Sequence, residues 1–93
     1  MDKKINQLIE IAEFAMEAND YAHAEKKYIN ALYLMDNPKS EEYQKVVNKL
    51  AKCYAAQKNF AGAKECLEEL LFYAKKNKVQ QKTLKKHIHT PPG

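Results

Sequence analysis

Turn-forming residues and cysteines are scarce in this sequence, and arginine is absent from it. Its 93 residues include two glycines, three prolines and two cysteines. So few turn formers argue against a β fold of many short strands, and 45% hydrophobic residues argue against disorder. The length suffices for one small domain with a thin core. The composition therefore predicts a single all-α domain.

Long apolar segments are also missing. No run approaches the ~18 residues that a membrane span needs, and Glu10, Glu13 and Glu17 exclude a signal-peptide apolar region near the N-terminus. Cys53 and Cys66 lack the close spacing of a zinc module or a disulfide framework. We therefore expect a cytoplasmic protein with reduced thiols and no membrane partner.

The motifs of catalysis and cofactor binding are missing as well. Gly62 falls inside an expected helix and Gly93 ends the chain, so neither can belong to a glycine-rich phosphate loop. His87 and His89 are two residues apart, a spacing that splays ligands around a helix, and His23 belongs to a different helix. The sequence predicts no enzyme, no catalytic residue, no metal and no cofactor.

Positive charge is concentrated near the C-terminus. Residues 1–74 carry ten lysines and all twelve acidic residues, whereas the six lysines that follow have no acidic neighbour. This Lys-rich segment leaves open non-specific nucleic-acid binding through a C-terminal helix as an alternative function. The absence of arginine disfavours it, because arginine supplies the planar, bidentate contacts that specific recognition uses.

Apolar residues recur at spacings of three and four in four successive segments, which is the pattern of amphipathic helices. Asp20, Ser40 and Asn59 stand before three of these segments and are the residue types that cap helix N-termini. Pro38 should end the second helix, because proline lacks the amide hydrogen and disfavours helical geometry before it.

The two halves of the chain repeat each other with an offset of 39 residues. Eight pairs match: Leu8 with Val47, Ile11 with Leu50, Ala12 with Ala51, Asp20 with Asn59, Tyr21 with Phe60, Ala24 with Ala63, Tyr28 with Leu67 and Ala31 with Leu70. A repeated helix pair is typical of a helical solenoid, in which stacking of the pairs completes the core.

These residues resemble the tetratricopeptide repeat, whose pattern is a large residue, Leu, a small residue and Tyr, followed by Ala, an aromatic and Ala. The second repeat matches closely, but in the first repeat Ala15 stands where the motif has Tyr, and Pro38 comes two residues late. The offset of 39, against 34 in the family, implies a longer helix or loop between Met35 and Ser40.

The resemblance implies a short solenoid of antiparallel helix pairs, a tetratricopeptide-like superhelix of five helices. The 34-residue spacing places Leu84 and Ile88 at large-residue positions of a C-terminal capping helix, although Gln81 and Lys85 fall where apolar and small residues belong. The expected boundaries are a domain at 1–90, repeats at about 5–38 and 40–76, the capping helix at about 78–88, and a frayed tail at 90–93.

The first helices of stacked repeats line a concave groove, so the resemblance implies a non-enzymatic protein-interaction module, an adaptor or scaffold that binds a partner's peptide segment or helix. Lysines at helical spacing predict a partly basic groove and a partner with acidic residues. A solvated lysine face is the alternative reading. The predicted groove residues are Asn6, Ile9, Glu13, Met16, Lys45, Asn48, Lys49, Lys52, Lys82 and Lys86.

Self-assembly is a further alternative, because so few repeats leave an end on which another copy could stack as a homo-oligomer. Phe14, Tyr33 and Phe72 lie off the main apolar stripes and are the first candidates for such contacts.

Overall fold

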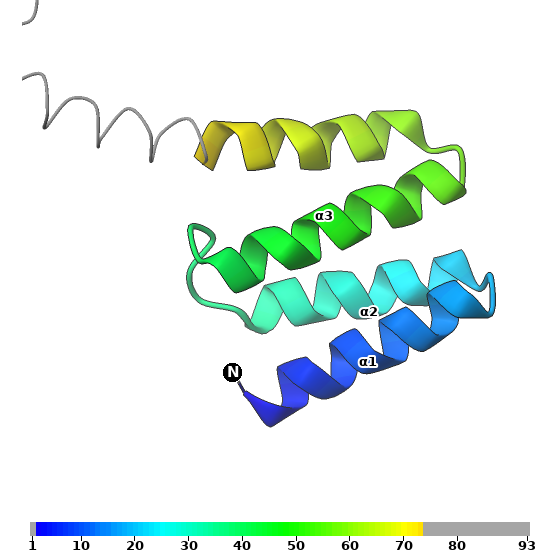
Figure 1. Cartoon of the computed structure of the whole chain (residues 1–93), viewed down its shortest axis with the longest axis horizontal. Coiled ribbons are helices and arrows are strands. Elements are labelled where there is room, and N and C mark those ends of the chain that lie inside the picture. The colour runs from blue at the N-terminus through cyan, green and yellow to red at the C-terminus, as the bar shows by residue number, and fades with distance from the viewer. Residues whose placement is uncertain (1, 74–93) are drawn as a thin grey trace, which may run out of the picture.

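The computed structural model describes residues 2–73, which form four helices and no strand (Figure 1). These are α1 (Lys3–Glu17), α2 (Tyr21–Leu34), α3 (Glu41–Ala56) and the fourth helix, which is described from residue 60 to residue 73. The all-α prediction is confirmed. The described part contains four helices, not the five expected, and the capping helix predicted at 78–88 lies outside the described residues.

Each helix begins at a side chain that accepts a hydrogen bond from the backbone of its first turn. Asp20 accepts from the His23 amide at 3.3 Å, and Ser40 accepts from the Tyr43 amide at 3.1 Å. The remaining pairs are Asp2 with the Lys4 amide at 2.7 Å and Asn59 with the Gly62 amide at 3.1 Å. The three caps predicted from the sequence are therefore present. Each satisfies a backbone donor that has no partner within the helix.

The turns inside the two repeats have the same geometry. Asn19 and Lys58, which are 39 residues apart, both adopt left-handed backbone conformations, with φ of 62° and 61°. The residue after each of these donates its amide hydrogen to the carbonyl five residues earlier. The Asp20 amide donates to the Ala15 carbonyl, and the Asn59 amide donates to the Tyr54 carbonyl, both at 2.8 Å. This closure is the Schellman motif, which reverses the chain at a helix C-terminus.

The extra residues of the long repeat lie in a loop. α2 has 14 residues against 15 in α1, so it is not lengthened. Met35 is already extended at the end of α2, and the connection runs to Ser40, the cap of α3. Its Met35 side chain packs against the core, which fixes the loop to the end of the helix pair.

Small side chains allow the helices to approach closely. α2 packs on α1 on one side and on α3 on the other, and the helices lie antiparallel in the order of the sequence (Figure 1). Ala12, Ala24 and Ala31 are fully buried at these contacts. Tyr28 and Val47 are the largest side chains of the core that are almost completely buried. The core is therefore thin and centred on α2.

Candidate binding groove

A shallow groove lies between α1 and α3, with α2 at its floor. One hollow of about 440 Å³ opens in it. α1 contributes Glu13, Met16 and Glu17, α2 contributes Tyr28, and α3 contributes Lys49 and Lys52. Residues 36 positions apart in the sequence thus meet at one site because α3 returns alongside the first repeat.

An ion pair bridges the groove. The Lys49 ammonium donates a hydrogen bond to the Glu13 carboxylate, with side chains 39% and 47% exposed. Exposed pairs of this kind contribute at most about 1 kcal/mol, because water screens the charges and two long side chains lose freedom. The pair therefore links α1 to α3 across the groove but adds little to the stability of the fold.

Tyr28 forms the floor of this hollow and is 2% exposed. Burial raises the pKa of its phenol to about 12, with smaller contributions from Glu13 and Cys53. The cause is that an ionised phenolate would lose hydration in the core and face nearby negative charge. Tyr28 consequently stays neutral at physiological pH.

The lysines of α3 differ in their surroundings. Lys45 lies 3.5 Å from Glu41 in an exposed pair one helical turn apart, and Lys49 is paired with Glu13. Lys52 is exposed, lines the hollow and forms no ion pair among the described residues. The lysine stripe expected from the sequence is therefore partly neutralised within residues 2–73, and Lys52 is the lysine of the hollow that is available for a partner.

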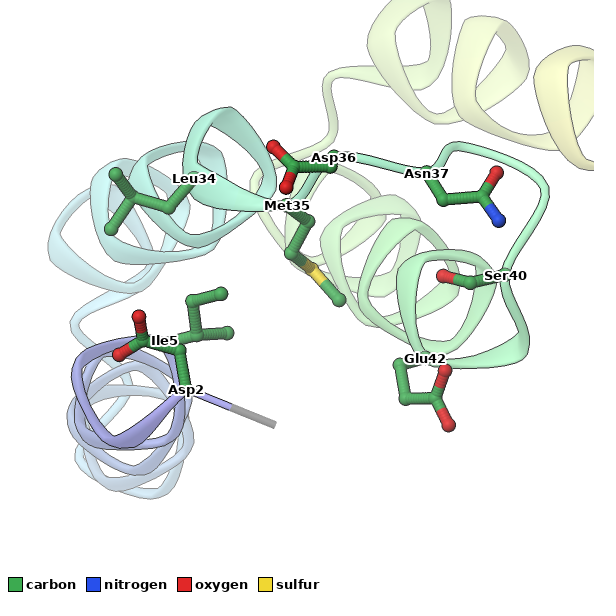
Figure 2. A pocket seen from close by; sticks show the side chains of 8 residues that line it. All are labelled: Asp2, Ile5, Leu34, Met35, Asp36, Asn37, Ser40 and Glu42. Atoms are coloured by element: carbon green, nitrogen blue, oxygen red, sulfur yellow. The ribbon is translucent and has the colours of Figure 1, made fainter.

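A second hollow of about 630 Å³, which was not predicted from the sequence, lies at the other end of the groove (Figure 2). It forms where the starts of α1 and α3 meet the connection after α2. Ile5, Leu34 and Met35 supply apolar walls, and the polar lining consists of Asp2, Asp36, Asn37, Ser40 and Glu42. Three of these side chains are carboxylates, so this end of the groove has negative charge.

Two of the polar groups at this end already serve the fold. The Asp2 carboxylate caps α1 and the Ser40 hydroxyl caps α3. Acidic residues near helix starts were visible in the sequence, but only the folded loop after α2 adds Asp36 to the lining of the same hollow (Figure 2).

The structure groups four of the predicted groove residues, because Glu13, Met16, Lys49 and Lys52 line one hollow. The other described ones lie along the same two helices but outside it. Ile9 is half-buried against the core, whereas Asn6, Lys45 and Asn48 are exposed. Lys82 and Lys86 lie outside the described residues.

The two cysteines are buried, and their thiols do not form a reactive pair. Burial raises the pKa of both Cys53 and Cys66, with a further contribution from neighbouring glutamates. The Cys53 thiol donates to the Tyr21 carbonyl at 3.0 Å. Both behave as small hydrophobic residues of the core.

Metal-ligating groups do not gather in the part of the chain that the structure describes: no three His, Cys, Asp or Glu side chains there could hold an ion. Within the same residues, no helix is long and apolar enough to cross a membrane.

Antiparallel helix pairs with equivalent caps, equivalent turns and a groove between their first helices define a helical-repeat protein. The chain matches the tetratricopeptide repeat family over residues 15–88, which is more than half of its length. It therefore belongs to that family, whose repeats generally mediate protein–protein interactions. Comparison with curated proteins and with solved structures gives no match.

Proposed function

We propose that the groove between α1 and α3 binds a peptide segment or a helix of a partner protein, so that the domain acts as an adaptor. The observation that supports this most is the presence of two hollows along one face. Their α1 side is lined by the N-cap Asp2 and by Ile5, Glu13, Met16 and Glu17, which lie along one side of the helix. A bound segment can therefore contact both hollows without the protein rearranging.

The charge along the groove gives the partner a polarity. At one end, Lys52 forms no ion pair among the described residues and attracts a carboxylate, which retains the expectation of acidic residues in the partner, although Glu17 in the same hollow opposes this attraction. At the other end, Asp36 and Glu42 beside Ile5 favour a cationic or apolar side chain. The bound segment thus carries acidic residues toward Lys52 and none toward Asp36, a finer requirement than an acidic partner alone.

The test is selection from a random peptide display library on the full chain, followed by anisotropy titrations with the selected synthetic peptides. Lys52→Glu should weaken binding several-fold and reduce its salt dependence, because each exposed charge pair contributes below about 1 kcal/mol. Lys26→Glu is the matched control: Lys26 is exposed on α2 and lines neither hollow.

The outcomes separate the classes of partner. Equal affinities for both variants would place the contact elsewhere and overturn the groove proposal. The same titration with a single-stranded oligonucleotide tests the alternative. If only the oligonucleotide binds, and its binding weakens steeply with salt, the domain binds nucleic acid and the groove proposal is wrong.

A further inference from the structure

The two ends of the helix stack expose the two halves of one interface. Inside the molecule, α2 of the first repeat packs on α3 of the second. The fourth helix is the repeat equivalent of α2, and α1 is the equivalent of α3, at the offset of 39. Among the described residues, no helix covers the outer face of the fourth helix or that of α1. Within residues 2–73, the surface that joins the repeats is thus repeated at opposite ends, without a covering helix at either end.

Exposure at equivalent positions locates these faces. On the α2 side, Tyr28 is 2% exposed, whereas its equivalent Leu67 is 47% exposed. Tyr21 is half-buried against the core, whereas its equivalent Phe60 is 67% exposed. Leu71 is 67% exposed on the same face of the fourth helix. These apolar side chains are typical of a buried repeat contact rather than of a solvated helix face.

The outer face of α1 shows the matching change. Leu50 and Cys53 of α3 are 6% and 0% exposed, but their equivalents Ile11 and Phe14 are 43% and 75% exposed. A hollow of about 250 Å³ lies beside Ile11, Phe14 and Ala18. Ala18 is the equivalent of Gln57, so a smaller side chain leaves more room there than in the internal interface.

We propose that a second copy of this chain packs its α1 on the fourth helix of the first, as α3 packs on α2 within one molecule. Phe60 of one copy then lies beside Phe14 of the next, at the positions where the Tyr21 carbonyl accepts from the Cys53 thiol inside the molecule. The contact is head-to-tail and therefore open, so copies add in a concentration-dependent series.

The rival occupant is the chain's own C-terminal segment. At the family spacing, this segment places Leu84 and His87 at the positions that Leu50 and Cys53 occupy in α3. In α1 the same positions hold Ile11 and Phe14, which are both apolar and exposed. α1 of a second copy therefore resembles the covering helix α3 more closely than residues 78–88 do.

Sedimentation velocity of the full chain over a wide range of concentration tests the proposal. The wild type should associate progressively. Phe14→Lys and Leu67→Lys, each of which damages one end, should weaken self-association at least about tenfold, because a lysine would lose its hydration in an apolar contact. Tyr33→Lys is the matched control: α2 is covered on both sides, yet Tyr33 is 88% exposed and takes no part in the repeat interface.

Mixing the two single-end variants gives a sharper result. Phe14→Lys retains an intact fourth helix and Leu67→Lys retains an intact α1, so together they should form one-to-one pairs that do not grow. Circular dichroism melts check that both variants fold. A wild type that stays monomeric, or a mixture that fails to pair, would overturn the proposal. If the wild type is a monomer and Leu67→Lys sharply lowers the melting temperature, the outer face of the fourth helix is covered by residues 74–93 of the same chain instead.

Discussion

The first repeat and the second repeat share their caps and turns but differ in what surrounds them. Tyr28 is 2% exposed and its equivalent Leu67 is 47% exposed, although both are large apolar positions of the same pattern. The reason is that α2 lies between two helices, whereas within residues 2–73 the fourth helix has a neighbour on one side. Burial in a helical stack thus depends on position in the stack as well as on the repeat motif.

The two repeats also differ in the sizes of the side chains at one pair of facing positions. In the second repeat, the first helix carries Tyr54 and the second carries Gly62, where an added Cβ would lie 3.0 Å from the Tyr54 ring. In the first repeat, the equivalent residues are Ala15 and His23. The position that faces Ala15 thus carries a larger residue than Gly62, but His23 is exposed and a hollow lies beside it.

The largest contrast is expected from truncating the equivalent large residues. Tyr28→Ala should destabilise the protein by about 3 to 5 kcal/mol, because it opens a cavity in a core that cannot collapse. Leu67→Ala should cost below about 1 kcal/mol, because half of that side chain is already in water. Urea denaturation of dilute protein measures both. Similar losses would mean that the two repeats are equally enclosed.

Alkaline titration should reveal the buried phenol of the first repeat. The unfolded Tyr28 ionises near pH 10 and the folded one near pH 12, so the unfolded state loses its proton first as pH rises. The free energy of unfolding should therefore fall between these values, by about 1 to 2 kcal/mol for this group.

Denaturation at a series of pH values, compared with Tyr28→Phe, isolates this contribution. The Phe variant should show a shallower decline, whereas Tyr33→Phe, at an 88% exposed site, should follow the wild type. If Tyr28→Phe and the wild type decline in parallel, the phenol is not the source of the pH dependence.

Coupling between Gly62 and Tyr54 is expected to be of intermediate size. Gly62→Ala should destabilise by about 1 kcal/mol in the wild type, because the clash with the ring exceeds the gain in helix propensity. In a Tyr54→Ala background the same change should stabilise by up to about 1 kcal/mol. A double-mutant cycle measures the difference. Additive effects would show that the Tyr54 ring does not limit the size of residue 62.

The smallest effect should come from the left-handed turns. Lys58→Gly should stabilise by about 1 kcal/mol, because a side chain with a Cβ is strained at φ 61°. Asn19→Gly should gain less, since asparagine tolerates this conformation better. Thermal melts test both, with Ala56→Gly in the helix as a control that should lose stability. No gain in Lys58→Gly would show that the turn is not strained.

Much of the fold followed from local patterns. The helix starts at Asp20, Ser40 and Asn59 could be predicted because each cap acts within three residues of its own position. The repeat pairing was predicted from small residues such as Ala12 and Ala51, which recur where helices approach closely. The 39-residue offset between the repeats, in contrast, allowed either a longer second helix or a longer loop. Only the structure showed that the extra residues lie in the loop after α2.

The groove was predicted in part. Helical spacing brought Glu13 and Met16 onto one face, and Lys49 and Lys52 onto another, and in the structure these four residues line one hollow. That they bind a partner stays a prediction. The bridge from Lys49 to Glu13 was not predicted, because sequence reasoning treated the lysines as one uniform stripe. Among the candidates for self-assembly, Phe14 lies on the end face that we propose for it, but Tyr33 does not.

The sequence by itself determined where helices begin, where they turn and which faces are apolar, because capping, backbone conformation and helical periodicity act over a few residues. The tertiary structure decided which of those apolar faces are covered and which charges meet. Tyr28 and Leu67 occupy the same position in the repeat, yet their exposure differs because burial depends on a neighbour that the local sequence does not contain.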